Sequence, residues 1–184
     1  MATPDAPLDV QGAVHDFLAA HIGIDPKVIV RGWQNRAALP EVSSYAVLTL
    51  INAPRRGTNV HLWQNIPDDD WGLNERVRML TLYDAQVDFC GLDEAVVGAQ
   101  AARLVMLARD AVAVDFFRER GLSCQYADDP RSLPFSNDVD QWEVRYSVTL
   151  HLSAWSSADI ARDAFRDVSL HLENVDVHHP VKGV

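Results

Sequence analysis

Lysine is scarce in this 184-residue chain, and its scarcity argues against functions that need dense positive charge. Only Lys27 and Lys182 are lysines, and the formal net charge is −10. Wrapping nucleic acid requires dense positive charge against the phosphates, so an acidic chain is a poor candidate for that role. We interpret the charge as a solvated acidic surface. The alternatives are a surface that repels DNA and a surface that meets a basic partner.

Cysteines and long apolar runs are also few. Cys90 and Cys124 are too few for a disulfide framework and form no C-x-x-C pair. The N-terminus shows no basic-plus-apolar signal, and no stretch reaches the about 18 apolar residues of a membrane span. We therefore expect a soluble protein that is made in the cytoplasm and keeps both thiols reduced.

Motifs that carry chemistry are absent. The chain has no G-x-S-x-G nucleophile elbow and no glycine-rich phosphate loop, and its histidines lack the spacing of a metal site. We expect no catalytic residue, no cofactor and no metal. Asp68, Asp69 and Asp70 could supply carboxylates to a metal-dependent hydrolase, but a solvated charged loop is the simpler interpretation.

A long alternating stretch, Gln141–Trp155, stands out among the residues that are present. Successive side chains on a strand point to opposite faces, so alternation of apolar and polar residues predicts one long β-strand. Such a strand needs partners along its whole length, which favours an antiparallel sheet with one covered face. The predicted apolar face contains Trp142, Val144, Tyr146, Val148, Leu150, Leu152 and Ala154.

The rest of the chain predicts one α+β domain over residues 1–184, with flexible ends at 1–6 and 178–184. We expect a mainly antiparallel sheet of four to five strands with a long hairpin, and helices packed on one face. An alanine stripe at Ala95, Ala99 and Ala102 should pack on the sheet. The predicted helices are 7–22, 92–109, 110–120 and a short piece after Trp155; the predicted strands are 27–31, 44–52, 57–64, 76–90, 141–155 and, more weakly, 168–177.

Several residues are candidates for subunit or partner contacts. Trp33 and Arg36 flank an irregular loop, and tryptophan and arginine are enriched at interface centres. Trp71 lies beside the three aspartates at the predicted hairpin tip, 65–74, which we expect to dock on a neighbouring subunit or on another partner surface. The alternatives without an interface are that Trp33 simply covers the core and that 65–74 is an acidic loop without a partner.

Arg131 and Arg145 complete the candidate set. Arg131 follows the turn Asp128-Asp129-Pro130 and could pair with one of these acids or with Glu143, either to support the fold or to contact a subunit. Arg145 lies on the polar face of the long strand. Both interpretations of Arg131 stay open on the sequence alone.

Three motifs together resemble the phage neck and tail terminator family. They are Arg31–Arg36 (RGWQNR) followed by Leu39-Pro40, then Tyr126–Pro134 (YADDPRSLP), and Asn174-Val175-Asp176. The resemblance covers about residues 10–180, and the order and spacing of the motifs make it specific. This chain departs from the family's pattern in the loop 65–74, which is long and acidic here.

The resemblance implies an α+β structural protein of the virion without catalysis. It implies a ring, typically a homohexamer, at the head-proximal end of the tail, which ends tube growth and joins the tail to the head connector. The implied partners are further copies of the chain, the tail tube protein and the connector or neck proteins; DNA passes through without specific binding, and no membrane is involved. A monomeric tail-assembly chaperone or binding module is the alternative, and the carboxylate-metal hydrolase is a third hypothesis.

Overall fold

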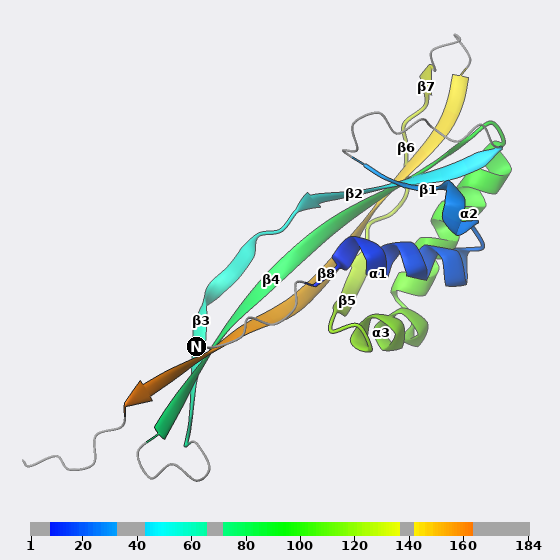
Figure 1. Ribbon diagram of the computed structural model, residues 1–184. Helices are drawn as coiled ribbons and strands as arrows, with labels where there is room; N and C mark the ends of the chain where they lie inside the picture. The colour runs from blue at the N-terminus through cyan, green and yellow to red at the C-terminus, as the bar shows by residue number, and fades with distance from the viewer. Residues whose placement is uncertain (1–7, 33–42, 66–71, 137–141, 164–184) are drawn as a thin grey trace, which may run out of the picture.

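The computed structural model describes residues 8–32, 43–65, 72–136 and 142–163, and it has an α+β fold (Figure 1). Eight strands and three α-helices lie within these ranges. The strands are β1 (Ile29–Arg31), β2 (Ser44–Asn52), β3 (Arg55–Asn65), β4 (Gly72–Gly91), β5 (Ser123–Ala127), β6 (Arg131–Ser132), β7 (Phe135–Ser136) and β8 (Trp142–Asp163). The helices are α1 (Val10–Phe17), which continues as a π-helical turn, Leu18–Ile22; α2 (Glu94–Ala108); and α3 (Ala111–Arg118).

The sheet runs in the order β1-β2-β4-β8-β5. The β1–β2 pair is parallel and the other pairs are antiparallel, while β3 pairs with the part of β4 that β2 leaves free. The predicted number of four to five strands was too low, since β5, β6 and β7 were not foreseen. Strands of two to five residues are too short to show alternation, which explains the omission.

Two long strands form the axis of the molecule. β4 has 20 residues and β8 has 22, and they pair without interruption from Gly72↔Asp163 to Gly91↔Val144. The predicted strand 141–155 is confirmed, but it ends too early. The helical piece expected after Trp155 was wrong, because Ser156–Asp163 continues the ladder with β4. The weaker strand expected at 168–177 lies outside the described residues.

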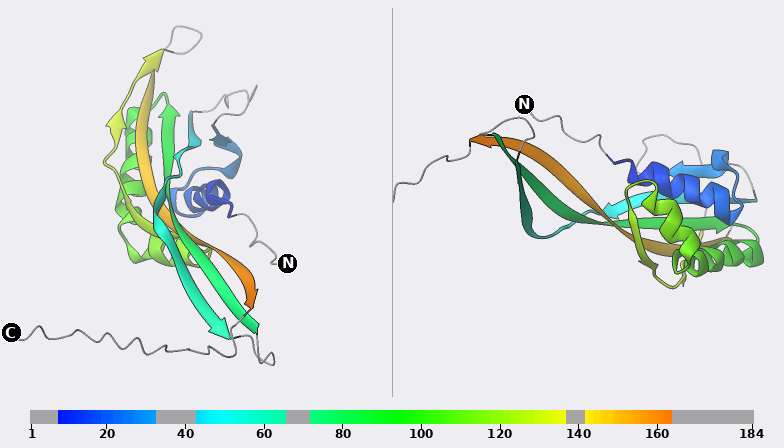
Figure 2. Two further views of the ribbon diagram at one scale, coloured as in Figure 1. Left: turned by 90° about the vertical axis from the view of Figure 1, so that its left-hand side faces the viewer. Right: turned by 90° about the horizontal axis from the view of Figure 1, so that it is seen from below.

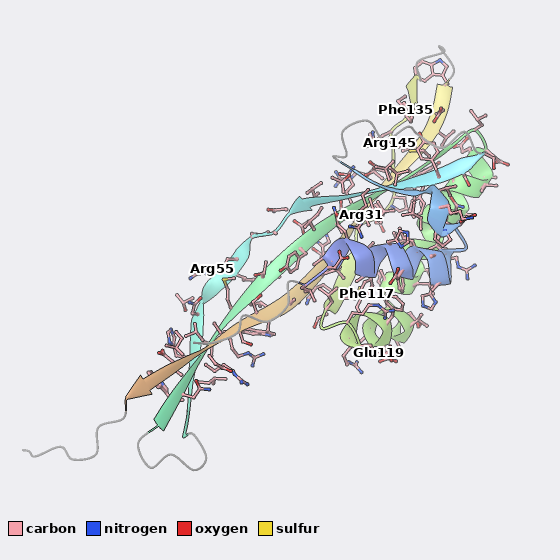
Figure 3. All side chains as sticks on the ribbon, viewed as in Figure 1. Arg31, Arg55, Phe117, Glu119, Phe135 and Arg145 are labelled. Atoms are coloured by element: carbon pink, nitrogen blue, oxygen red, sulfur yellow. The ribbon has the colours of Figure 1, made fainter. Side chains whose placement is uncertain are left out.

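The core lies on one face of this axis. The predicted apolar positions Val148, Leu150, Leu152 and Ala154 are buried there, although Trp142 at the strand's start is 73% exposed. On β4, Ala85, Val87 and Phe89 share the same face and are also buried. The helices cover this face, as expected, with Phe17 of α1 and Phe117 of α3 in ring contact at a centroid distance of 5.0 Å. Figure 3 shows Phe117 inside the helical layer.

The ends of the helices agree with their sequence signals. Asp9, Asp93 and Asp110 accept hydrogen bonds from backbone N–H groups in the first turns of α1, α2 and α3. Gly23 ends the first helical segment with φ of 83°, a conformation that glycine adopts without a Cβ clash. Gly121 plays a similar part after α3, with φ of 73°.

Helix α2 buries a different face from the one that we predicted. The alanine stripe at Ala95, Ala99 and Ala102 is exposed, so the prediction that it packs on the sheet was wrong. The buried stripe instead contains Val97, Ala101, Leu104 and Ala108. Burying valine and leucine removes more apolar area from water than burying alanine alone, which explains the rotation.

Half of the long ladder extends beyond the helical body. Figures 1 and 2 show β3 and the adjoining parts of β4 and β8 reaching out as a twisted ribbon away from the helices. We call this ribbon the arm and define it as β3, residues 72–82 of β4 and residues 153–163 of β8. The hairpin predicted around 65–74 is confirmed in its strands, because Asn65 pairs with Leu73; residues 66–71 themselves lie outside the described ranges.

Both cysteines should make stability depend on alkaline pH. Burial and the nearby Asp88 carboxylate raise the pKa of Cys90 to about 11, and burial raises the pKa of Cys124 to about 11. Since the folded state disfavours the thiolates, their stabilising effect is complete below the unfolded value of 9.0 and is lost as the pH rises towards 11. Urea unfolding should show a falling free energy of unfolding across this window.

The control is the Cys90→Ala/Cys124→Ala variant. Its free energy of unfolding should fall less over the same pH window, although its absolute stability is lower because buried atoms are removed. Identical pH dependence in the two proteins would show that the thiols do not contribute.

Candidate assembly surfaces

Cross-strand pairs hold the three strands of the arm together. Arg76 on β4 donates two hydrogen bonds to Asp159 on β8, from Nε to Oδ1 at 2.7 Å and from a terminal nitrogen to Oδ2 at 2.9 Å. These hydrogen bonds and the positive charge lower the pKa of Asp159. On the other side of β4, the imidazole of His61 on β3 forms a hydrogen bond with the buried carboxylate of Glu75. The arm therefore has its own polar connections, independent of the helices.

Large apolar side chains remain exposed on the arm. Trp63 is 55% exposed and Trp155 is 49% exposed, and the guanidinium of Arg78 lies 4.7 Å from the Trp155 ring centroid. Val60, Leu62 and Ile160 are exposed as well. The register places Trp155, Val60 and Leu62 on one face of the ribbon and Trp63 and Ile160 on the other. Tryptophan and arginine are enriched at interface centres, so both faces of the arm are candidate contact surfaces.

A second set of polar contacts lies on the sheet face opposite the helices. Asp88 on β4 is buried and accepts from Arg145 on β8 at 2.7 Å and from the amide of Gln86 at 2.9 Å. Close by, Tyr45 donates to Glu143 at 3.2 Å, and burial raises the pKa of Tyr45 well above its usual range. These contacts link β2, β4 and β8 within one chain.

His151 occupies the centre of the same face. Its Nδ1 lies 2.7 Å from Asp84 on β4, and its Nε2 lies 3.4 Å from Asp128, which follows β5. The ring of Tyr126 packs on the imidazole at a centroid distance of 4.4 Å. Nε2 makes no hydrogen bond with a described residue, so the Asp84 hydrogen bond and the Tyr126 ring contact are what connect β5 to the two central strands at this point.

The structure locates two of the residues that the sequence marked as contacts. Arg145 lies in the upper part of β8 in the view of Figure 3. Its guanidinium donates a hydrogen bond to the Asp88 carboxylate. Arg131 lies on β6, exposed, and forms no ion pair with a described residue, so the possible pairing with Asp128, Asp129 or Glu143 is not formed within the described chain. Its role in a subunit contact stays a prediction. The other candidates lie outside the described residues: Trp33, Arg36, Asp68, Asp69, Asp70 and Trp71.

Sequence reasoning missed the arm's own surface. Trp63 and Trp155 fell on predicted strands without being marked, and Arg78 and Asp159 were not considered. A signal was available, since Trp155 is a large apolar residue at a position that the alternation assigns to the polar face of β8. Without the pairing of Ser156–Asp163, however, nothing placed these side chains on a projecting ribbon.

Within the described ranges, no three His, Cys, Asp or Glu side chains gather in a way that could hold a metal ion. No described helix is long and apolar enough to cross a membrane. The described polar contacts mainly join strands to one another, and they are typical of structural support.

Substitution of the two candidate arginines, Arg145 and Arg131, should have very different effects on stability. In Arg145→Ala the buried Asp88 carboxylate loses its charged partner and keeps only the neutral Gln86 amide as a side-chain donor among the described residues. We therefore expect the free energy of unfolding to fall by about 2–3 kcal/mol. The matched variant Arg131→Ala removes an exposed side chain without a described ion pair, and should cost less than about 0.5 kcal/mol. Urea denaturation of both variants measures the difference. Equal, small losses would mean that the Asp88–Arg145 contact does not support the fold.

Comparison with known proteins agrees with this structural picture. No curated protein matches the sequence significantly. A family model described as phage neck terminator protein matches residues 9–179, which is nearly the whole chain. The chain belongs to the phage neck terminator protein family.

Proposed function

We propose that the protein is a structural, non-enzymatic component of the virion that forms a ring at the head-proximal end of a phage tail. The ring ends the growth of the tail tube and joins the tail to the head connector. Family membership supports the neck location, and a homohexamer is the assembly that the family resemblance implies. The partners in this proposal are neighbouring copies, the tail tube protein and the connector or neck proteins.

The arm is the observation that carries the proposal. It lies beyond the helical body and exposes Trp63 and Trp155 on strands that belong to the chain's own sheet. Leaving a large apolar side chain in water forgoes roughly 2–3 kcal/mol that burial would provide. A surface of this kind is explained by a lasting partner, as a ring subunit has on both sides.

The acidic charge is consistent with a ring that DNA crosses. Carboxylates repel phosphates, so a net charge of −10 disfavours binding of DNA as it passes. A monomeric tail-assembly chaperone would also use an exposed apolar surface, but it would not form a closed ring. Oligomeric state therefore separates the two functions.

The first test is the assembly state of the purified full-length chain. We expect particles of several subunits by mass photometry and rings with a central opening in negative-stain images. The proposal is contradicted if the protein stays monomeric and neck particles isolated from virions also lack a ring of this chain.

The second test addresses termination of the tail. A phage carrying an early stop codon in this gene should produce filled heads without tails and tail tubes of variable, increased length. Expression of the wild-type chain from a plasmid should restore tails of uniform length. Uniform tails in the absence of the protein would show that it does not terminate the tube.

A further inference from the structure

Charge is divided unevenly between the arm and the rest of the chain. The arm carries five arginines, at positions 55, 56, 76, 78 and 162, and three acids, Glu75, Asp159 and Asp163. Two of these acids already contact a basic side chain of the arm: Glu75 contacts His61, and Asp159 contacts Arg76. Arg55, Arg56 and Arg78 thus have no acidic partner among the described residues. The arm strands are basic in a chain whose total charge is −10.

Two edges of the sheet, at β3 in the arm and at β5 in the body, are open among the described residues. β3 pairs with β4 alone, and β5 pairs with β8 alone, so each has one edge without a strand among the described residues. β3 lies on the β2 side of the sheet and β5 on the opposite side. An exposed edge can accept a strand from another chain, because its backbone N–H and C=O groups are available in a row.

The β5 edge has accessible side chains, and an exposed carboxylate follows it in the chain. Ser123, Gln125 and Tyr126 are exposed on this short strand. Asp129 follows it with a side chain that is 88% exposed, and its described contact is a distant one, 3.8 Å from Arg109. The exposed Asp129 carboxylate can pair with an arginine of the basic β3 strand. Arg109 and Arg131 are also exposed near it, so the complementarity rests on this one carboxylate. Unlike β3, the β5 edge lies on the helical body.

We infer that the arm of one copy docks head-to-tail on the body of a second copy, with its β3 edge along the β5 edge and Arg56 close to Asp129. This inference rests on the proposed function, because it names the surfaces through which neighbouring ring subunits meet. Contacts between two different edges are heterologous, and heterologous contacts close into rings when the rotation between copies is suitable. Pairing of arm strand with arm strand is disfavoured, since it brings arginines of like charge together.

Nucleic acid is the competing ligand for a basic ribbon with exposed aromatic residues. Arg76 is already engaged by Asp159, and Arg78 lies against Trp155. Arg55 and Arg56 alone provide too few phosphate contacts for substantial affinity at physiological salt. A second copy of this acidic chain fits the arm better.

The test exchanges charge across the inferred contact. Arg56→Asp and Asp129→Arg each place like charges together, so each variant alone should self-associate at least about tenfold more weakly than the wild-type chain. An equimolar mixture should assemble again, since alternating copies bring the two altered sites together and the two native sites together. The variant with both substitutions in one chain should also assemble. Mass photometry and negative-stain images of the full-length proteins measure all four.

Arg103→Asp is the matched control for charge. Arg103 is exposed on α2 and forms no described ion pair, so this variant should assemble like the wild-type chain. Circular dichroism melting confirms that each variant is folded. Assembly of folded Arg56→Asp at wild-type strength overturns the inference, as does normal assembly of Asp129→Arg or failure of the mixture to recover.

Two further outcomes separate the inference from its alternatives. If the wild-type chain forms rings and neither substitution weakens them, the proposed function stands and the docking surface is rejected. If the wild-type chain is monomeric and virions contain no ring of it, both are contradicted. Fluorescence anisotropy with duplex DNA at about 0.15 M salt tests the competing ligand. DNA binding that Arg56→Asp abolishes, with particle mass unchanged, would assign the arm to nucleic acid and overturn the inference.

Discussion

The antiparallel ladder between β4 and β8 is the constraint on which the rest of the structure depends. Because side chains alternate between faces, a slip of one residue would move every core residue of a strand to the opposite face. Three polar contacts span the ladder at intervals: Asp88–Arg145, Asp84–His151 and Arg76–Asp159. They join β4 to β8 in the body and in the arm alike. The apolar core and these contacts therefore specify the same register, and together they define where the arm begins.

The two halves of the ladder have different sources of stability. In the body, β2 and β5 extend the sheet and the helices cover its apolar face, so Val87 and Val148 are removed from water. In the arm, three strands are connected by cross-strand pairs, and no helix covers either face among the described residues. Ribbons with so little buried surface are only marginally stable on their own. The arm thus depends on its covalent continuity with the body and, in the proposed ring, on contact with a neighbour.

The same contrast explains what the sequence could and could not predict. Burial on one face produced the clear alternation of Leu150, Leu152 and Ala154, which predicted the strand and its face correctly. Beyond Trp155 there is no core to select apolar residues, so Ser156-Ser157-Ala158 gives no period-two signal and suggested a helix. The prediction of the buried face of α2 was wrong for another reason: valine and leucine remove more apolar area from water than alanine does, so their stripe packs on the sheet. At the candidate site, sequence placed Arg145 on the polar face, but its partner Asp88 is 57 positions away and only the register reveals it.

Separating a self-sufficient body from a dependent arm suits a subunit that must fold before it assembles. The core contacts among α1, α2, α3 and the sheet lie within one chain, so the body does not need a neighbour to bury its apolar residues. The exposed tryptophans of the arm can then contribute their burial energy to assembly rather than to folding. In the proposed head-to-tail ring each copy uses one arm and receives one, so closure leaves no arm uncovered and no receiving edge open. Such a ring has a fixed size, as the end of a tail requires.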